Sequence, residues 1–480
     1  MNKLIQKYKN TPVQVKASIW FLVCTVIHKS ISIVSTPIFT RLLSSEDYGK
    51  YGGFVSWMGI LTCFVTFYIY SGIYPQAIVK FDNEKDQYSS AMQGLTFTLV
   101  IAWIGIYLPF NQFWNSLFSL DTKQMLAMFV IMWANSVFGF WSAEQRVEYK
   151  YRNLVIVTLL EAILQPGLCV LLIYVCPNDL TGVVWGIAIA TFVSYFFLFM
   201  RQLYRGRVFY SGKIWRYSLK LAIPLVPHYL SMVLLNSSDR IMIQKIVGDS
   251  EAGLYNLAYT VSVCGTLVNQ AVLQTLQPWI LQRIKAKEID KTKKVAYVAL
   301  IGIAFFNLFI ILLAPEVVNI FGPGSYKKAL WAMPPIILSV YFMFMYNLFA
   351  IFEFYFEKST YLSSATMVGA GLNVGLNYVF ISQFGYLAAG YTTLICYSVF
   401  AIMHYIFMRR ICKKELENIK VYDIKVLTLI SIVFLLFGFS FMITYNYILV
   451  RYSLAAGILI LCFLRRRAII TWFKTLRRRT

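Results

Sequence analysis

The chain has 480 residues, of which 59% are hydrophobic and 14% charged, and its mean hydropathy is +0.64. Soluble proteins carry about 45–50% apolar and about 25% charged residues, so this composition excludes an ordinary soluble multidomain enzyme. The aromatic content of 17% excludes a disordered chain. A net charge of +23 favours either nucleic-acid binding or basic loops on the cytoplasmic side of a membrane, and the hydropathy decides for the membrane.

The sequence predicts an all-α membrane protein with about fourteen transmembrane helices, because apolar stretches of about 20 residues follow one another along the chain. The predicted spans are 13–38, 51–73, 88–110, 124–143, 153–176, 181–200, 217–243, 252–280, 293–314, 330–352, 359–382, 385–408, 422–444 and 446–464. Arg451 shortens the apolar run of the last one, which makes it the weakest. The connections are short, and no cleavable signal is expected at the N-terminus.

Lys and Arg residues are concentrated in every second loop along the chain, as the positive-inside rule predicts for loops on the cytoplasmic side. With the N-terminus placed in the cytoplasm, 33 of the 44 Lys and Arg residues fall inside, 8 fall outside and three lie within spans. A missed or invented helix would destroy this ratio. We therefore expect both termini in the cytoplasm, and nucleic acid is not needed as a partner to explain the charge.

Signatures of metal and nucleotide binding are missing from the sequence. Its eight cysteines form no CxxC pair, it has three histidines, and no metal-ligand spacing occurs. No GxxxxGK[ST] stretch is present either, so ATP is not expected as a direct driver. We expect no metal and no cofactor, and the cysteines are interpreted as small apolar fillers.

Two similar segments indicate an internal repeat. Ser45–Tyr51 and Asp249–Tyr255 share an acidic residue, a glycine and a tyrosine at a constant offset, and both follow a span on the outer side. Six spans separate them, so the two copies run parallel, related by an axis along the membrane normal. We predict an N-terminal six-helix lobe at 1–210, a second lobe at 211–410, and two additional helices with a basic tail at 411–480.

These segments resemble bacterial polysaccharide-lipid flippases, the Wzx-like exporters of O-antigen and capsule. The matching motifs are Thr36–Ser44 leading to Glu46–Gly49, Asp239–Arg240 leading to Glu251–Tyr255, and Asn373–Asn377 followed by Phe384–Gly390. The resemblance covers about residues 15–408. It implies a member of the multidrug/oligosaccharidyl-lipid/polysaccharide exporter superfamily that flips undecaprenyl-diphosphate-linked oligosaccharides across the bacterial inner membrane. It also implies polysaccharide polymerase and chain-length proteins as partners, and membrane lipid around it.

Polar residues within the first span predict one cavity wall. Thr25, His28, Lys29, Ser32, Ser35 and Thr36 share a helical face, and charges at bilayer depth normally face protein or water. We expect the Lys29 ammonium to attract a diphosphate; the alternatives are a structural ion pair and a snorkelling lysine. Arg41, near the outer end, is a further candidate for the diphosphate or for an interface.

The seventh span carries two prolines, Pro224 and Pro227, which predict a bend that is either a hinge or a static kink. The polar residues that follow are candidates for the substrate site: His228, Asp239 and Arg240. Arg240 is expected either to meet the diphosphate or to anchor the helix at the headgroups.

Amide side chains of the eighth and eleventh spans suit sugar hydroxyls, since each offers donors and an acceptor. The candidates are Gln270, Gln274, Gln277, Asn373 and Asn377. Hydrogen bonding between helices is the alternative role for them. The Gly371-x-x-x-Gly375 pattern predicts close helix packing.

Acidic residues within spans are candidates for ion coupling, because a buried carboxylate can carry a proton. Glu161, in the fifth span, is the coupling candidate, whereas Glu353 and Glu357 are expected to cap the tenth helix.

Three hypotheses for function follow. The first is a flippase of lipid-linked oligosaccharides that works by alternating access between two lobes, driven by an ion gradient or the membrane potential. The second is an ion-coupled multidrug/cation antiporter, which would need carboxylates rather than Lys29 and His28 in its cavity. The third, a membrane polysaccharide polymerase or glycosyltransferase, would need a larger outer loop than this chain has.

Overall fold

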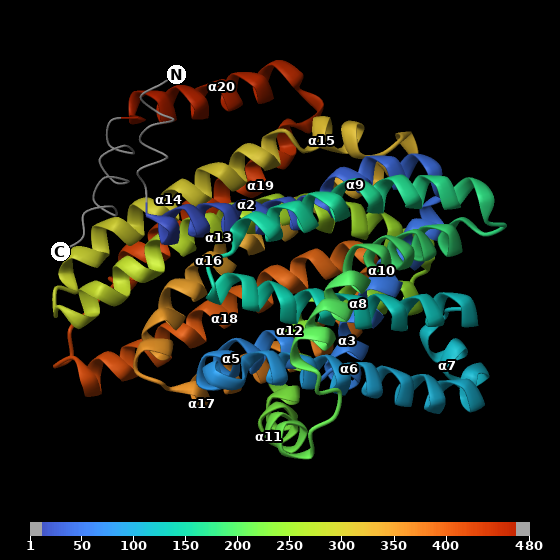
Figure 1. The fold of residues 1–480 in the computed structure, drawn as a ribbon. Helices are drawn as coiled ribbons and strands as arrows, with labels where there is room; N and C mark the ends of the chain where they lie inside the picture. The colour runs from blue at the N-terminus through green and yellow to red at the C-terminus, as the bar shows by residue number, and fades with distance from the viewer. Residues whose placement is uncertain (1–11, 467–480) are drawn as a thin grey trace, which may run out of the picture. The chain divides into compact units, whose positions relative to one another are not determined.

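The computed structural model describes residues 12–466, and within them it contains only helices and their connections (Figure 1). The chain divides into two compact units. Unit 1 comprises the residues up to Leu43 together with Lys50–Val233, and unit 2 comprises Ser44–Gly49 and the residues from Leu234 onward. The breaks at Gly49/Lys50 and Val233/Leu234 fall inside helices, and the break at Leu43/Ser44 falls in the short connection between two helices. The predicted lobe limits at 210/211 and 410/411 stay predictions, because compactness does not mark where a repeat begins.

Unit 1 is built around one central helix, α10 (Asp179–Gly206). Its helices are α2 (Val13–Leu42), most of α3 (Ser45–Val65), α4 (Ile69–Gly72), α5 (Tyr74–Lys80), α6 (Lys85–Tyr107), α7 (Asn111–Phe118), α8 (Thr122–Val147), α9 (Tyr151–Val175), α10 (Asp179–Gly206), α11 (Gly212–Ala222) and the start of α12 (Val226–Ile246). α10 packs along α6, α8 and α9, and α2 packs on α9. α8 and α10 are mostly buried, while α2 and α9 are mostly exposed, as expected for helices that face lipid.

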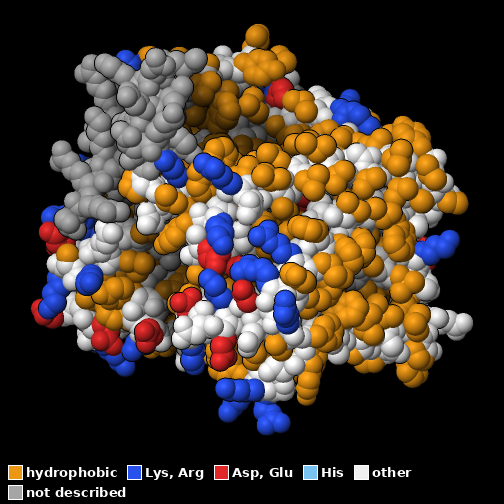
Figure 2. Space-filling view, in the orientation of Figure 1, with side chains coloured by type: hydrophobic (Ala, Val, Ile, Leu, Met, Phe, Trp, Pro, Cys, Tyr) orange, Lys and Arg blue, Asp and Glu red, His pale blue; other side chains and the backbone are white. Residues whose placement is uncertain are grey.

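Unit 2 has α16 (Met333–Tyr355) at its centre. The other helices are the rest of α12, α13 (Asp249–Lys285), α14 (Asp290–Leu312), α15 (Ala314–Phe321), α17 (Ser359–Phe384), α18 (Tyr386–Glu415), α19 (Ile424–Ile443) and α20 (Ile448–Leu464). α16 packs against α13, α14, α17, α18 and α19 and is almost entirely buried. Large apolar side chains cover much of the visible surface of the molecule, as lipid contact requires (Figure 2).

Eleven helices of the described chain are long and apolar enough to cross a membrane. At the three other predicted spans the structure has α3 and α13, which are long enough but less apolar, and α20, which is apolar but shorter. α3 opens with Glu46, Asp47 and Lys50, and α13 carries amides along its middle, so polar residues lower the mean hydropathy of both. The chain is a multi-pass membrane protein, and its count of fourteen spans and the side of its termini stay predictions.

The seventh predicted span is broken where its prolines stand. A 3-10 turn at Ile223–Leu225 separates the short helix α11 from α12, so the predicted bend is confirmed. The start of the predicted window, from 217, belongs to α11, and the candidate span Gly212–Ile246 includes both helices. The second predicted span, 51–73, is interrupted as well, because Phe67 and Tyr68 take a left-handed conformation between α3 and α4.

The two similar segments of the sequence contact each other within unit 2. A Cβ atom on Gly49 would lie 1.8 Å from the Asp249 carbonyl oxygen, and one on Gly253 would lie 2.1 Å from the Ser45 carbonyl oxygen. The Ser45 and Ser250 hydroxyls are also 2.9 Å apart. Each contact of one segment thus has its counterpart in the other, as in an interface between equivalent surfaces.

Two local predictions were wrong. A Cβ atom on Gly371 or Gly375 would meet nothing within 4 Å, so this pattern does not bring a neighbouring helix close. Glu353 does not cap α16: its side chain is buried and hydrogen-bonded to His404 on α18. Spacing along one helix cannot reveal which of its faces meets a neighbour.

Candidate functional site

In unit 1, α2 and α9 bring His28 and Glu161 together. The His28 Nδ1 atom lies 3.0 Å from Glu161 Oε2, and the Glu161 side chain is only 2% exposed, whereas that of His28 is 44% exposed. The His28 ring stacks on Phe138 of α8, whose ring in turn stacks on Tyr195 of α10. A pair of this kind can hold or release a proton, because either partner can carry it.

Lys29 lies next to this pair, half-buried in its spanning helix. Among residues 12–466 its ammonium forms no ion pair and no hydrogen bond. Arg146 of α8 reaches the same helix, where its guanidinium donates to Thr25 Oγ1 at 3.3 Å and lies over the Phe21 ring. We name His28, Lys29, Arg146 and Glu161 the unit 1 polar cluster. Sequence reasoning missed Arg146, because the contact between α2 and α8 joins residues 121 positions apart.

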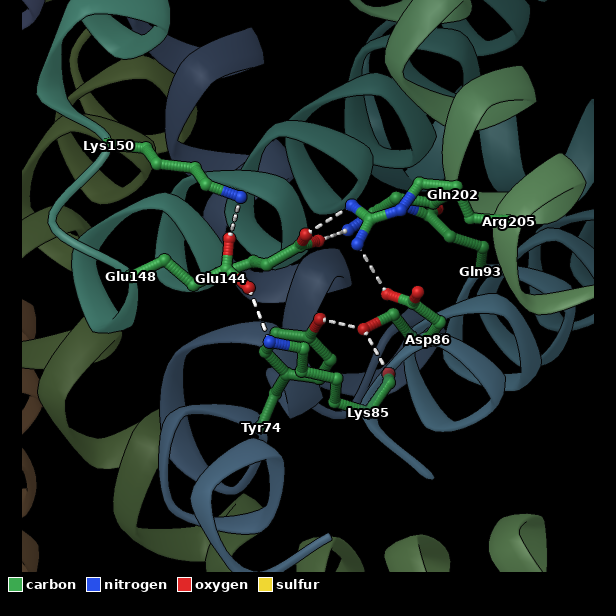
Figure 3. A network of polar contacts seen from close by, with 10 residues as sticks. Tyr74, Lys85, Asp86, Gln93, Glu144, Glu148, Lys150, Gln202 and Arg205 are labelled. Atoms are coloured by element: carbon green, nitrogen blue, oxygen red, sulfur yellow. Dashed lines mark hydrogen bonds and ion pairs between the residues drawn. The ribbon is translucent and has the colours of Figure 1, made fainter. Parts of the chain in front are cut away.

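A second network fixes the ends of α6, α8 and α10 (Figure 3). Glu144 accepts hydrogen bonds from Gln202 at 2.6 Å and from Arg205 at 2.7 Å, and Arg205 also pairs with Asp86. The Gln93 amide donates to Gln202 at 2.6 Å. Every charge here has a partner, so this network is structural.

Glu148 follows α8 in the connection to α9 and pairs with two lysines (Figure 3). Its carboxylate lies 2.6 Å from Lys85 and 2.5 Å from Lys150. Burial alone would raise the pKa of Glu148, but the hydrogen bonds from Lys150 and Lys85 outweigh burial and lower it.

In unit 2, α12, α13, α17 and α18 enclose a network of oxygen and amide groups. The Tyr255 hydroxyl donates to Asp239 Oδ2 at 2.5 Å, and the Ser238 hydroxyl donates to Asn373 Oδ1 at 2.6 Å. Asn377 donates to Asn373 and accepts from the Thr392 hydroxyl. We name this set the unit 2 amide network. Asp239, Asn373 and Asn377 are all buried, and no more than 2% of any of them is exposed.

Arg240 is buried beside this network, although the sequence placed it at the outer end for diphosphate or headgroups. Its guanidinium donates to Ser237 Oγ at 3.0 Å and to the Asn236 carbonyl at 3.3 Å, and it lies over the Tyr259 ring. The Tyr397 hydroxyl of α18 donates to the Asn236 side chain at 2.7 Å.

A histidine–carboxylate pair also occurs inside unit 2. His404 Nδ1 lies 2.7 Å from Glu353 Oε1, and both side chains are fully buried. The remaining His404 nitrogen and Glu353 oxygen make no hydrogen bond in the described chain. Sequence reasoning missed this pair, since the partners are 51 positions apart on different helices.

The other predicted site residues are more exposed. Gln274 is exposed, Gln270 and Gln277 are half-buried, and within the described range none of the three amides makes a hydrogen bond. Ser32 and Arg41 are exposed on α2, where they donate to the carbonyls of Lys29 and Pro37. His228 is half-buried on α12, beside the Tyr229 ring.

The structure thus brings some predicted residues together and leaves others apart. His28, Lys29 and Glu161 form one cluster, and Asp239, Asn373 and Asn377 form another. Arg41 and His228 join neither of them through a contact described above. In the part of the chain that the structure describes, no group of three or more His, Cys, Asp and Glu side chains is placed to hold a metal ion.

Solved structures share this fold. An inward-facing multidrug resistance transporter of the MATE family matches at a TM-score of 0.64 and 17% identity, covering 81% of this chain and 96% of the other. The lipid II flippase MurJ, in an inward closed conformation, matches at 0.67 and 13%, covering 94% and 100%. A superfamily transporter from Pyrococcus furiosus matches at 0.58 and 16%, covering 84% and 96%. The fold is therefore that of the MOP-superfamily transporters and flippases.

The sequence profile of the family described as polysaccharide biosynthesis protein matches residues 15–284, and the chain belongs to this family. The resemblance seen in the sequence motifs is thereby confirmed. No curated protein sequence matched the chain.

Proposed function

We propose that the protein flips undecaprenyl-diphosphate-linked oligosaccharides, such as O-antigen, capsule or exopolysaccharide repeat units, across the inner membrane of a bacterium. The lobes would alternate between inward-open and outward-open states. The family and the fold support a transporter or flippase. One observation supports an anionic cargo: among residues 12–466, Lys29 lies in a spanning helix without a counter-ion, while the buried carboxylates have partners.

The carboxylates support an anionic rather than a cationic cargo. Four acidic residues of the long helices are each buried and hydrogen-bonded to a neighbour: Glu161 and Asp239 within their helices, and Glu144 and Glu353 near helix ends. A cationic drug would need one of them to be free. Lys29, by contrast, has no counter-ion in the described chain, and a cation at bilayer depth is costly unless it faces water or binds an anion.

The glutamine row of α13 supports a glycan. The amides of Gln270, Gln274 and Gln277 make no hydrogen bonds within the described part of the chain. Free amides in a spanning helix are expected to face a water-filled space rather than acyl chains. There they would donate to and accept from sugar hydroxyls, while the polyprenyl tail would stay in lipid.

Glu161 and His28 are the proposed coupling pair. Protonation of the pair would change the charge beside Lys29, and thus the strength with which the cluster holds a diphosphate. A proton gradient would then drive the cycle; a sodium gradient or the membrane potential are the alternatives.

The test measures how fast a fluorescent polyprenyl-diphosphate glycan is flipped between the leaflets of proteoliposomes. Dithionite quenches only the fluorophores in the outer leaflet, so it reports the fraction that has crossed. Hydrogen bonds to charged groups contribute about 1.5–3 kcal/mol, so Lys29→Ala should slow flipping by about tenfold or more. Lys29→Arg, which keeps the charge, is the matched control and should retain most of the rate. Full flipping by Lys29→Ala would contradict the anionic-cargo proposal.

The multidrug/cation antiporter remains the second candidate, because MATE-family transporters share the fold. Drug export that survives Lys29→Ala but is lost in Glu161→Ala would favour it. Glycan chain extension by the purified protein would instead identify a polymerase.

A further inference from the structure

Helix α11 carries a cationic pocket that the proposed transport path does not use. The pocket has a volume of about 480 Å³ and is lined by Gly212, Lys213, Arg216, Tyr217 and Lys220. Residues 213, 216, 217 and 220 share one face of the helix, since they are spaced three or four positions apart. We name these lining residues the α11 pocket. Lys and Arg side chains gather at the lower edge of the molecule, over α11 (Figure 2).

The opposite face of α11 holds this pocket in place. The Trp215 ring nitrogen donates to the Ala91 carbonyl of α6 at 2.8 Å, and the Ser218 and Tyr88 hydroxyls are 2.9 Å apart. Ala222 is part of the hydrophobic core of unit 1, and Ile214 and Leu219 pack against it. The cations are therefore presented by a helix that is fixed to the bundle and not by a free loop.

The pocket has a positive charge without a counter-ion. Its lining contains no acidic residue, and in the described chain none of Lys213, Arg216 and Lys220 pairs with a carboxylate. Lys80 of α5 adds a fourth cation, lying 5.1 Å from the centre of the Tyr217 ring and donating to its hydroxyl at 3.4 Å. Arg205 of the same unit, by contrast, is neutralised by Glu144. An anion is therefore the expected ligand.

The surroundings of the pocket point to the membrane surface. Only the 3-10 turn Ile223–Leu225 separates α11 from the spanning helix α12. Large apolar side chains are exposed on both sides of the helix: Phe209 and Tyr210 before it, Ile223 and Leu225 after it. Because the apolar face of α11 packs on the bundle, its basic face and the exposed apolar residues beside it are what fit the boundary between headgroups and acyl chains.

We propose that the α11 pocket binds the phosphate group of a membrane lipid at the level of the headgroups. Arg216 would take two phosphate oxygens through its guanidinium, and Lys213 and Lys220 would add point charges on either side. The lipid is either bulk anionic phospholipid or the polyprenyl-diphosphate carrier, which present the same phosphate chemistry. The inference does not depend on the proposed transport, because binding is measured without it.

Native mass spectrometry of the full-length protein in detergent tests the proposal with three lipids: phosphatidylglycerol, undecaprenyl diphosphate and diacylglycerol, which lacks the phosphate. The pocket variant is Lys213→Gln, Arg216→Gln, Lys220→Gln. The matched control removes the same charge from exposed lysines of unit 2: Lys285→Gln, Lys287→Gln, Lys294→Gln. A third variant, Lys213→Arg with Lys220→Arg, keeps the charge.

The wild type should bind at least one phosphate lipid more tightly than diacylglycerol. From the contribution of each basic residue near an anionic lipid surface, the pocket variant should lose about 100-fold in affinity for that lipid. The control and the charge-keeping variant should stay near wild type. Loss with phosphatidylglycerol identifies bulk phospholipid, and loss with undecaprenyl diphosphate alone identifies the carrier. Wild-type affinity in the pocket variant, or an equal loss in the control, would overturn the proposal.

Discussion

Replacing Gly253 by alanine should loosen the contact between the two similar segments of the chain. The new Cβ atom would lie 2.1 Å from the Ser45 carbonyl oxygen and 3.1 Å from its carbon. Both atoms are backbone, so no side chain can rotate away, and the helices must separate by about 1 Å in a tightly packed interior.

The magnitude follows from a matched comparison. Gly371→Ala makes the same chemical change in a helix, but its Cβ would meet nothing within 4 Å. Both substitutions gain about 1 kcal/mol from the higher helix propensity of alanine. The difference in the free energy of unfolding between the two variants therefore isolates the cost of overpacking, about 1–3 kcal/mol. Gly253→Ala should therefore be less stable than Gly371→Ala by that amount, while Gly371→Ala should equal or exceed the wild type.

Thermal unfolding in detergent, followed by tryptophan fluorescence, measures the order of the midpoints. Gly49→Ala should behave like Gly253→Ala, since its Cβ would lie 1.8 Å from the Asp249 carbonyl oxygen. Equal midpoints for Gly253→Ala and Gly371→Ala would refute the argument that these two segments are in backbone contact.

Three further outcomes are expected. Glu148→Gln should lower the thermal unfolding midpoint modestly at pH 7. Because the folded-state pKa of Glu148 is lowered, its ion pairs stabilise the protein above the ordinary pKa near 4.5, and this stability is lost as the pH falls through the folded-state pKa. The midpoints of the variant and the wild type should therefore converge in acid, and a gap that stays constant with pH would contradict this. Arg451→Gln should lower the free energy of unfolding by about 1–3 kcal/mol, because it removes the buried partner of Glu316 and the contact that holds the start of α20. Limited proteolysis should then cut α20 faster, and an unchanged rate of cleavage would count against the prediction. Glu353→Ala should unfold well below Glu353→Gln, since Gln keeps an acceptor for His404 whereas Ala leaves that ring unsatisfied; equal midpoints would mean that the pair is not stabilising.

Local sequence was sufficient to predict the class of protein. Apolar stretches of spanning length and the uneven distribution of Lys and Arg are properties of single segments, so they predicted an all-helical membrane protein without knowledge of any contact. The proline pair of the seventh span predicted a break for the same reason, since each proline removes its own backbone donor. The motifs at Gly49 and Gly253 indicated the family.

Tertiary structure alone decided which polar residues are free and which are already bonded. The sequence suggested Asp239, Asn373 and Asn377 for the substrate. All three side chains are buried, and each is hydrogen-bonded to another side chain of the unit 2 amide network. The sequence also treated Arg451 as a defect of the last span, whereas its side chain is 4% exposed and paired with Glu316.

The physical reason is the range of the interaction. Helical periodicity shows that His28 and Lys29 belong to a polar stripe, but it does not show that only His28 has a carboxylate partner, 133 residues away. Likewise, the sequence does not show that a backbone approaches Gly253 closely while nothing lies within 4 Å of a Cβ atom on Gly371. Propensity and hydropathy act within a segment, whereas hydrogen-bond partners and close approach arise only when segments pack.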